Sequence, residues 1–427
     1  MKKTVSLLLA LILALSLCAF ASADDRVEVE FWYGLGGATG EIIKNTIEEF
    51  NAMQDKYTIV GVTKGSYTET FKEIQAPIAA HNPPALTILE FSQVSTLANK
   101  GALQDLTDYI ANSEVVDMDN YYADINALYS KDGKNYAVAK DHDTIALLYN
   151  KALFDQYGVA YPDESWTWDD YKAAAEAITE ASGGSVYGAA CNTTNDQDGY
   201  FNIIYDFGGY VISEDRKSSG WDNENTIAAM NFVGSLMEKA WAPQPLVAEN
   251  GTDTLFNNRK VAMISQGSWM INSFYTYEGS EDYAWAVLPY ADVNGNGQAD
   301  EGERCSIYNG LGWAASAATK DPDAAWSLIE WFSSEAMQLK QSELGVTMAG
   351  YVGASDAFIN AFPGMDVSAF LKMETEGTLV FRPYSKYTSR WADQYQRGLV
   401  EAWNNPAVMT DVLYSLAGQM NALLAQE

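Results

Sequence analysis

The chain has 427 residues, with 57 Asp and Glu against 26 Lys and Arg, and its formal net charge is −31. Hydrophobic residues make up 48% and charged residues 19%, which is a globular composition rather than a disordered one. The negative charge argues against nucleic acid as a partner, because phosphates need a basic surface. Only two His are present, which leaves little room for zinc sites or catalytic triads built on His. At roughly 100–200 residues per domain, we expect two or three domains.

Residues 1–23 have the pattern of a secretory signal peptide. Lys2 and Lys3 precede an apolar run over residues 5–17, which is too short to span a bilayer. Ala21-Ser22-Ala23 then offers a small-x-small cleavage site. We therefore predict cleavage after Ala23 and an extracytoplasmic protein that is secreted, periplasmic or associated with the cell surface.

The three cysteines leave two questions open. Cys18 is a possible site for a lipid anchor, but bulky Leu17 before it and the lack of a Gly/Ser tether after it fit that alternative less well. Cys191 and Cys305 remain in the chain after cleavage. In an oxidising compartment they could form a disulfide, and two free thiols are the alternative.

Short β-rich runs then alternate with helical patterns. Within the first ninety residues, period-two alternation and apolar spacings of three and four predict a β-α-β-α-β order. The strands are expected at 27–32, 57–62 and 85–90, and the helices at 41–50 and 67–78. Such an order implies a mostly parallel, doubly wound sheet.

The alternation of strand and helix patterns continues after residue 144. Strands are expected at 145–149, 186–191, 261–264, 283–288 and 311–316, with helices at 168–182 and 222–241. The last hundred residues look almost wholly helical, notably at 322–332, 388–403 and 408–424. We therefore predict an α/β protein of two lobes, with a ligand cleft between them at the strand ends.

The glycine-rich segment 34–40 lies between the first strand and the first helix. Its last gap is one residue too long for the G-x-G-x-x-G fingerprint of a dinucleotide site. We expect a turn that brings backbone N–H groups and a helix N-terminus to the cleft wall, and a plain tight turn is the alternative.

Residues 292–303 match the calcium-loop pattern D-x-[DN]-x-[DN]-G-x₅-E at every specified position. Gly297 permits the sharp turn, and no regular helix pair flanks the loop, so we expect a calcium loop rather than an EF-hand domain. An unliganded Asn-Gly turn is the alternative. The predicted ligands of a structural Ca²⁺ are Asp292, Asn294, Asn296, Gln298 (through its carbonyl), Asp300 and Glu303.

An enzyme is the main alternative to a binding protein. Acidic pairs such as Asp141 with Asp143, or Asp169 with Asp170, could serve glycoside hydrolysis, but an acidic chain contains such pairs almost inevitably. No G-x-S-x-G, H-E-x-x-H or C-x-x-C motif occurs. The 26 Tyr and 12 Trp offer flat apolar faces with polar edges, which suit sugars.

A series of segments, in order along nearly the whole chain after the signal peptide, carries a resemblance to a known family. The chain resembles the extracellular solute-binding proteins of bacterial ABC importers, in the sugar-binding group that includes maltose-binding protein. The segments are FWYG at 31–34, DGKNYAV at 132–138, LYNKALF at 148–154, WTWD at 166–169, 256–269 ending in GSW, 309–316, and KDPDAAW at 320–326.

The resemblance implies a two-lobed, class II periplasmic-binding-protein fold. Lobe 1 would comprise 24–141 and 288–328, and lobe 2 would comprise 142–287 and 329–427. Hinges are implied near 140–143, 283–288 and 325–332. Ala85 stands where the family usually has an acidic residue after Pro-Pro, which puts contacts of that loop in doubt.

The resemblance also implies ligand contacts and a function. We expect a monomer that captures a mono- or oligosaccharide and delivers it to the permease subunits of an ABC importer, without catalysis. Another solute, such as a polyol, glycerol phosphate or peptide, is the alternative ligand. The residues implied to contact ligand are Trp269, Asp143, Tyr200 and Trp391, followed by Tyr33, Trp313 and Glu90.

Overall fold

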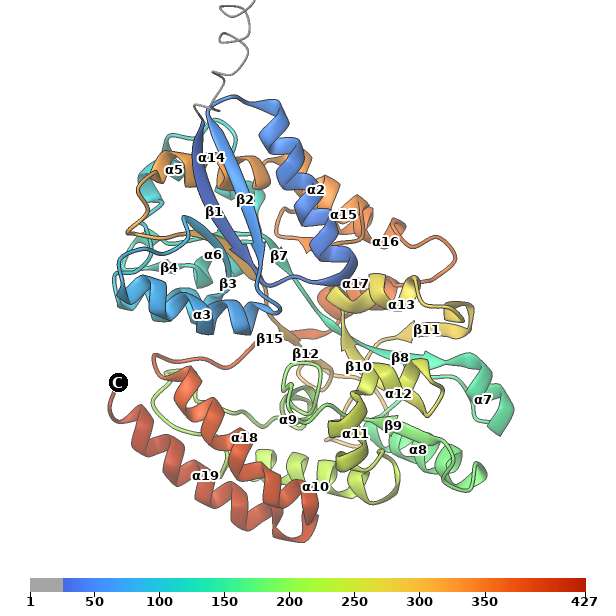
Figure 1. The fold of residues 1–427 in the computed structure, drawn as a ribbon. Helices are drawn as coiled ribbons and strands as arrows, with labels where there is room; N and C mark the ends of the chain where they lie inside the picture. The colour runs from blue at the N-terminus through green and yellow to red at the C-terminus, as the bar shows by residue number, and fades with distance from the viewer. Residues whose placement is uncertain (1–25) are drawn as a thin grey trace, which may run out of the picture.

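A computed structural model describes residues 26–427. The predicted signal peptide, its cleavage site and Cys18 lie outside these residues. Figure 1 shows two α/β lobes, one above the other, with chain segments running between them. Within the described part of the chain, no helix has the length and apolar character needed to cross a membrane.

The upper lobe in Figure 1, here the first lobe, is built on a five-stranded sheet in the order β2-β1-β3-β13-β6. Its strands are β1 (Val27–Tyr33), β2 (Tyr57–Thr63), β3 (Leu86–Glu90), β6 (Val138–Ala139) and β13 (Leu311–Ala315). β1 pairs in parallel with β2 and β3, whereas β13 runs antiparallel to β3 and β6. Along β1, Val29, Phe31 and Tyr33 face the core, as the period-two pattern predicts.

Helices cover both faces of this sheet. Ser66 begins α3 with a capping box, in which the Ser66 hydroxyl accepts from the Glu69 amide and the Glu69 carboxylate accepts from the Ser66 amide. The helices of this lobe are α2 (Gly37–Met53), α3 (Tyr67–Ala79), α4 (Phe91–Asn99), α5 (Thr107–Ala111), α6 (Ala123–Leu128) and α14 (Pro322–Phe332). Short elements are η1 (Met118–Asn120), β4 (Ser130–Lys131) and β5 (Lys134–Asn135).

The second lobe holds a four-stranded sheet in the order β11-β8-β10-β9. Its strands are β8 (Ile145–Asn150), β9 (Tyr187–Ala190), β10 (Val261–Gly267) and β11 (Tyr283–Ala286). Its helices are α7 (Lys151–Tyr157), α8 (Trp168–Ala181), α9 (Phe201–Asp206), α10 (Glu224–Lys239), α11 (Gln244–Asn250), α12 (Thr252–Asn257), η2 (Ser268–Met270), α13 (Ile271–Tyr275), η3 (Ser280–Asp282), α16 (Ser355–Asn360), α17 (Ser368–Thr375), α18 (Thr388–Asn404), η4 (Pro406–Val408) and α19 (Met409–Leu424). β8 is buried along its whole length, because β10 and β11 flank it and helices cover the sheet.

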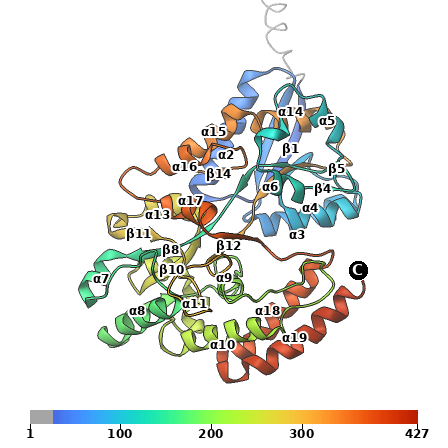
Figure 2. The same cartoon turned by 180° about the vertical axis from the view of Figure 1, so that it is seen from behind.

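Within residues 26–427 the chain passes between the two hydrophobic cores three times. It leaves the first core after Ala139 and enters the second at Ile145, through β7 (Asp141–His142). It returns between β12 (Cys305–Tyr308) and β13, and it crosses again between α14 and β14 (Met348–Ala349), through α15 (Glu335–Glu343). β14 pairs with β7, and β15 (Thr378–Phe381) pairs in parallel with β12. Figure 2 shows this crossing region from behind.

The predicted α/β fold with two lobes is confirmed, but one of the three implied hinges, at 283–288, does not lie at a crossing, because residues 283–286 form β11, an edge strand of the second-lobe sheet. Residues 325–332 belong to α14 in the first-lobe core, and the chain crosses between the cores after this helix. A short alternating strand has the same sequence pattern at a sheet edge as in a hinge. The pattern near 140–143 does fall on a crossing. Strands β12 and β15, which the sequence analysis missed, lie at this crossing region.

The exact lobe limits stay a prediction. One segment placed in lobe 2 by the resemblance also contacts the first lobe, because Lys340 on α15 forms an ion pair with Glu49 on α2. Tyr351 likewise packs its ring against Tyr121, with ring centroids 5.5 Å apart. In Figure 1, α15 lies beside α2 in the upper lobe.

Of the two possibilities for Cys191 and Cys305, the structure shows free thiols, both buried. Burial raises the pKa of both thiols, which makes them poor nucleophiles.

Asp206 is a buried carboxylate that fastens β12 to the second lobe. Its side chain accepts the indole N–H of Trp168 at 2.7 Å and also the backbone N–H of Cys305, the first residue of β12. Burial raises the pKa of Asp206 well above its ordinary value, while those two hydrogen bonds favour the charged form. The carboxylate therefore accepts hydrogen bonds from two buried N–H groups, those of the Trp168 indole and the Cys305 backbone.

We expect Asp206→Ala to lower the free energy of unfolding by about 2–4 kcal/mol, because it leaves both buried donors unpaired. Denaturant melts measure this, with Asp222→Ala as the control. Asp222 is exposed at the surface, so its removal should change stability by less than about 0.5 kcal/mol. Equal stability of the two variants would contradict this role for Asp206.

Candidate functional site

A cavity of about 360 Å³ lies between the two lobes. The first lobe contributes residues 34–36, Thr39 and 65–67, at the starts of α2 and α3. The crossing segments contribute Lys140, Asp141, Asp143, Asn309, Leu311, Val346 and Thr347. The second lobe contributes Asn195, Gln197, Trp269, Met270 and Ser273. Because both lobes line it, relative movement of the lobes would change its shape.

The glycine-rich turn brings two helix starts together at this cavity. A Cβ at Gly34 would lie 2.1 Å from the carbonyl carbon of Ser66, so only glycine permits this close approach. The first turn of α3 is satisfied by its capping box. α2 begins after Gly36 without a side-chain cap. In a helix without a side-chain cap, the backbone N–H groups of the first turn can donate to a ligand oxygen.

Trp269 is half-buried and lies in the second-lobe wall of the cavity. Its indole folds back over Gly267, where a Cβ would lie only 2.0 Å from an indole carbon. The glycine two residues earlier therefore sets the position of the ring, and Ile271 and Phe274 beyond it go into the core. A flat aromatic face at a cavity wall suits the apolar face of a sugar ring.

Asp143, Gln197 and Asn309 form a hydrogen-bonded chain in the cavity. The Gln197 Nε2 donates to the Asp143 carboxylate at 2.6 Å, and the Gln197 Oε1 accepts from the Asn309 Nδ2 at 3.2 Å. The Asn309 Oδ1 is buried and has no hydrogen-bond partner among the described residues. Burial, and then the charge of Asp141, raise the pKa of Asp143 well above its ordinary value.

The single lysine in the cavity wall is paired with its neighbour. The ammonium of Lys140 contacts the carboxylate of Asp141, and both side chains are almost fully buried. Asp141 also accepts the backbone N–H of Leu311 at 2.7 Å. The Lys140 ammonium lies 6.0 Å from the ring centroid of Trp313, within the range of a cation–π interaction.

Arg382 lies beside the cavity and joins the two lobes. Its guanidinium lies 2.8 Å from the Asp196 carboxylate of the second lobe and 3.7 Å from the Glu90 carboxylate of the first. It also donates to the hydroxyl of Tyr67, a residue of the cavity wall, at 3.4 Å. Tyr395 donates to the other oxygen of Asp196. Burial raises the pKa of Glu90, and the charge of Arg382 works against that rise.

Of the seven residues implied to contact ligand, the structure places Trp269 and Asp143 in the cavity wall. Glu90 lies next to it, buried against Arg382. The structure does not bring the other four side chains to the cavity wall, because they pack in the lobe cores and are 0–3% exposed: Tyr33, Tyr200, Trp313 and Trp391.

Each of these four buried positions has a packing reason. Tyr33 and Trp313 face inward from strands of the first-lobe sheet, and Trp313 stacks on Phe332 with ring centroids 4.3 Å apart. Tyr200 meets Trp403 edge to face. Trp391 lies on the buried face of α18, with its indole N–H donated to Ser385. Large aromatic residues fill lobe cores as readily as they line cavities.

The predicted calcium loop is an exposed turn closed by buried Glu303. Gly297 has φ of +73°, the left-handed conformation that the pattern requires of it. The Asn294 amide donates to Asp300 at 2.7 Å and to Glu303 at 3.2 Å, so two carboxylates face one point. Among residues 26–427, no group of three or more His, Cys, Asp or Glu is placed to hold a metal ion. Asparagine and backbone oxygens would have to complete the site.

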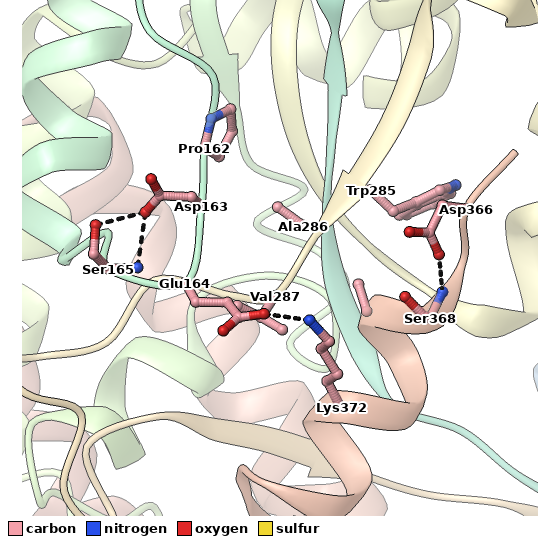
Figure 3. A pocket seen from close by; sticks show the side chains of 11 residues that line it. Pro162, Asp163, Glu164, Ser165, Trp285, Ala286, Val287, Asp366, Ser368 and Lys372 are labelled. Carbon is pink, nitrogen blue, oxygen red and sulfur yellow. Dashed lines mark hydrogen bonds and ion pairs between the residues drawn. The ribbon is translucent and has the colours of Figure 1, made fainter.

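A second pocket, of about 450 Å³, lies on the second lobe near the start of α17. Figure 3 shows its polar side chains turned toward one another: Glu164 pairs with Lys372, and Asp163 accepts from Ser165. The carboxylate of Asp366 accepts from the Ser368 backbone at 2.9 Å. These groups are satisfied within the protein, unlike the Asn309 Oδ1 of the interlobe cavity. We therefore take the interlobe cavity as the candidate site.

Sequence analysis missed most of the polar groups at this site. Gln197, Asn309 and Arg382 lie far apart in the chain and meet only through the crossings. The polar segment 192–199 between a strand and a helix was the one available signal for Gln197.

We expect Trp269→Ala to weaken ligand binding by roughly 2–4 kcal/mol, as loss of a cavity aromatic does. The free energy of unfolding should fall by much less than the roughly 3–5 kcal/mol of a core Trp→Ala change. Trp391→Ala, at a core position, provides that comparison. Gly267→Ala should also weaken binding, because its Cβ displaces the indole. Calorimetry and denaturant melts measure both quantities. Normal binding by a severely destabilised Trp269→Ala would place Trp269 in the core.

Two curated relatives are similar to this chain. The sn-glycerol-3-phosphate-binding periplasmic protein UgpB of Agrobacterium fabrum is 30% identical over 179 residues, which are 41% of each chain. The match thus spans less than half of that relative. The maltotriose-binding protein of Pyrococcus abyssi is 25% identical over 339 residues, which are 78% of this chain and 68% of the relative.

Among solved structures, the ABC substrate-binding protein Lmo0181 of Listeria monocytogenes, in complex with cycloalternan, has the same fold. Its TM-score is 0.82 at 20% identity, covering 94% of this chain and 100% of that one. Residues 45–361 match the family model described as bacterial extracellular solute-binding protein. The chain therefore belongs to the bacterial extracellular solute-binding protein family.

Proposed function

We propose that the protein captures a carbohydrate, a mono- or oligosaccharide, in the interlobe cavity and delivers it to the permease of an ABC importer. The observation that carries this proposal is the cavity itself, which is lined both by Trp269 and by the hydrogen-bonded chain of Asp143, Gln197 and Asn309. A sugar ring has an apolar face for the indole and hydroxyl groups at its edge for the polar chain. The similarity to a maltotriose-binding protein over most of both chains supports the same ligand class.

Lobe closure would couple binding to delivery. A sugar held by Trp269 from one lobe and by the start of α2 from the other contacts both lobes only when they are close together. The ligand therefore stabilises the closed form by its differential affinity for that form. The permease would then recognise the closed form. The crossings near Asp141, Asn309 and β14 are the segments that could bend.

In this proposal the protein binds its ligand without catalysing a reaction, lies outside the cytoplasm and is a monomer. The family and the relatives are solute-binding proteins, which supports the first two statements. Glycerol phosphate is the second candidate ligand, because of the partial match to a glycerol-3-phosphate-binding relative.

We expect a saccharide to raise the melting temperature and to be recovered unchanged. At about 100 times its Kd, a ligand stabilises the folded protein by about 2.7 kcal/mol. A thermal-shift panel of maltose, maltotriose and mannobiose, with sn-glycerol 3-phosphate beside them, identifies the ligand, and chromatography after prolonged incubation tests turnover. No stabilisation by any saccharide would contradict carbohydrate capture, and product formation at catalytic protein levels would contradict a binding protein.

We also propose that residues 292–303 bind a structural Ca²⁺, with Asp292, Asn294, Asn296, Gln298, Asp300 and Glu303 as ligands. The convergence of the Asp300 and Glu303 carboxylates on the Asn294 amide supports this, because a rotation of that amide would turn its oxygen toward the same point. Calcium at millimolar concentration outside the cell would fill even a weak site of this kind. Its effect would be on stability and not on sugar specificity.

With calcium present, adding EDTA should lower the melting temperature of the wild type by several degrees, because bound metal stabilises only the folded state. Glu303→Gln should remove this sensitivity, whereas Glu301→Gln, an exposed acid in the same loop but outside the ligand pattern, should keep it. Differential scanning calorimetry measures both. If the wild type has the same melting temperature with calcium and with EDTA, the loop does not bind calcium and is only a turn.

A further inference from the structure

The basic groups at the cavity are already neutralised. The charged residues that line it, in the part of the chain the structure describes, are Lys140, Asp141 and Asp143. Lys140 is paired with Asp141, which leaves the carboxylate of Asp143 as the excess charge. Beyond Tyr67, Arg382 lies between the carboxylates of Asp196 and Glu90. An anionic ligand would therefore meet no free cationic side chain there.

In the hydrogen-bonded chain of Asp143, Gln197 and Asn309, each bond has a fixed donor and a fixed acceptor. A carboxylate can only accept hydrogen bonds, so Asp143 obliges Gln197 to present its Nε2. The Gln197 Oε1 then faces Asn309, which obliges Asn309 to present its Nδ2. The Asn309 Oδ1 is thereby left as an acceptor without a protein partner, although Asn309 is only 3% exposed. A buried acceptor of this kind needs a donor.

We propose that Asp143, Gln197 and Asn309 form an orientation relay that presents two hydrogen-bond acceptors to the ligand, so that the cavity selects uncharged polyhydroxy compounds and rejects phosphorylated ones. This inference rests on the proposed function and names the ligand chemistry that the site accepts. Gln197 acts as a positioning residue, because it fixes which atom Asn309 presents.

Sugar hydroxyls match the site in both directions. A hydroxyl can donate to Asp143 or to the Asn309 Oδ1 and can accept from the N–H groups at the start of α2. The dianionic phosphoryl group of a phosphate monoester can use those N–H groups but has no proton to donate to the two acceptors, and the negative charge of Asp143 repels it. The net charge of −31 adds repulsion at long range. The site and the whole chain therefore disfavour anions independently.

The first experiment removes the carboxylate that pairs with Lys140. Asp141→Asn keeps an oxygen for the Leu311 amide and removes the charge that neutralises Lys140. The probes are maltotriose and mannobiose as neutral saccharides, and sn-glycerol 3-phosphate and inorganic phosphate as anions. By calorimetry, the wild type should bind a saccharide and not the anions. Asp141→Asn should raise the affinity for an anion relative to the saccharide by at least tenfold, while the exposed-site control Asp222→Asn leaves that ratio unchanged.

The second experiment tests the relay through its pH dependence. Near Asp143 the charged groups are Asp141 and Arg382, and the phenols of Tyr129 and Tyr308 also face it. In the wild type, lowering the pH from 8 to 5 should weaken saccharide binding or leave it unchanged, because Asp143 must be ionised to orient Gln197. In Gln197→Glu the two carboxylates must share a proton to remake the bond. Acidification should therefore strengthen saccharide binding in this variant, a reversal that a merely structural role would not produce.

The outcomes separate this inference from the proposed function. If no saccharide binds the wild type, the proposed function fails. If a saccharide binds but sn-glycerol 3-phosphate binds the wild type at least as tightly, or if Asp141→Asn leaves the ratio unchanged, the rejection of anions is overturned while carbohydrate capture stands. If Gln197→Glu follows the pH trend of the wild type, the relay is overturned.

Discussion

The structure depends on how charge is neutralised where its two lobes meet. Arg382 contacts Asp196 of the second lobe and Glu90 of the first, and neither lobe holds this ion cluster by itself. A buried charge left without its partner costs roughly 3–5 kcal/mol, whereas the intact cluster adds little net stability. The cluster therefore specifies how the lobes face each other more than it stabilises either of them. Arg382 also donates a hydrogen bond to the hydroxyl of Tyr67, which lines the cavity.

The same neutralisation of charge decides which groups the cavity offers to a ligand. Because Asp141 neutralises Lys140 and the two carboxylates neutralise Arg382, what remains for a ligand is a set of acceptors, an indole face and backbone donors. That set is complementary to a hydroxylated ring, which is apolar on its faces and carries both donors and acceptors at its edge. Binding and lobe closure then become one process, since the groups that recognise the ring come from both lobes and from the segments that join them.

Much of the fold could be predicted from local patterns. Period-two alternation located β1, and apolar spacing located α3, because these signals lie within one element. The family resemblance implied Trp269 as a ligand contact through the segment that ends in GSW, and the structure places Trp269 in the cavity wall. Trp391 could not be told from a cavity residue, since an amphipathic helix has the same pattern whichever core it faces. The chain of Asp143, Gln197 and Asn309 was beyond prediction, because two of its side chains come from separate crossings and the third comes from the second lobe.

The most direct test of carbohydrate recognition at this cavity is a crystal structure of the protein with maltotriose, or with mannobiose if that saccharide stabilises it more. We expect a sugar ring against the indole of Trp269, with hydroxyl groups within hydrogen-bonding distance of the Asp143 carboxylate and the Asn309 Oδ1. A saccharide bound elsewhere, such as in the pocket between Glu164 and Lys372, with the interlobe cavity free of sugar, would contradict the account.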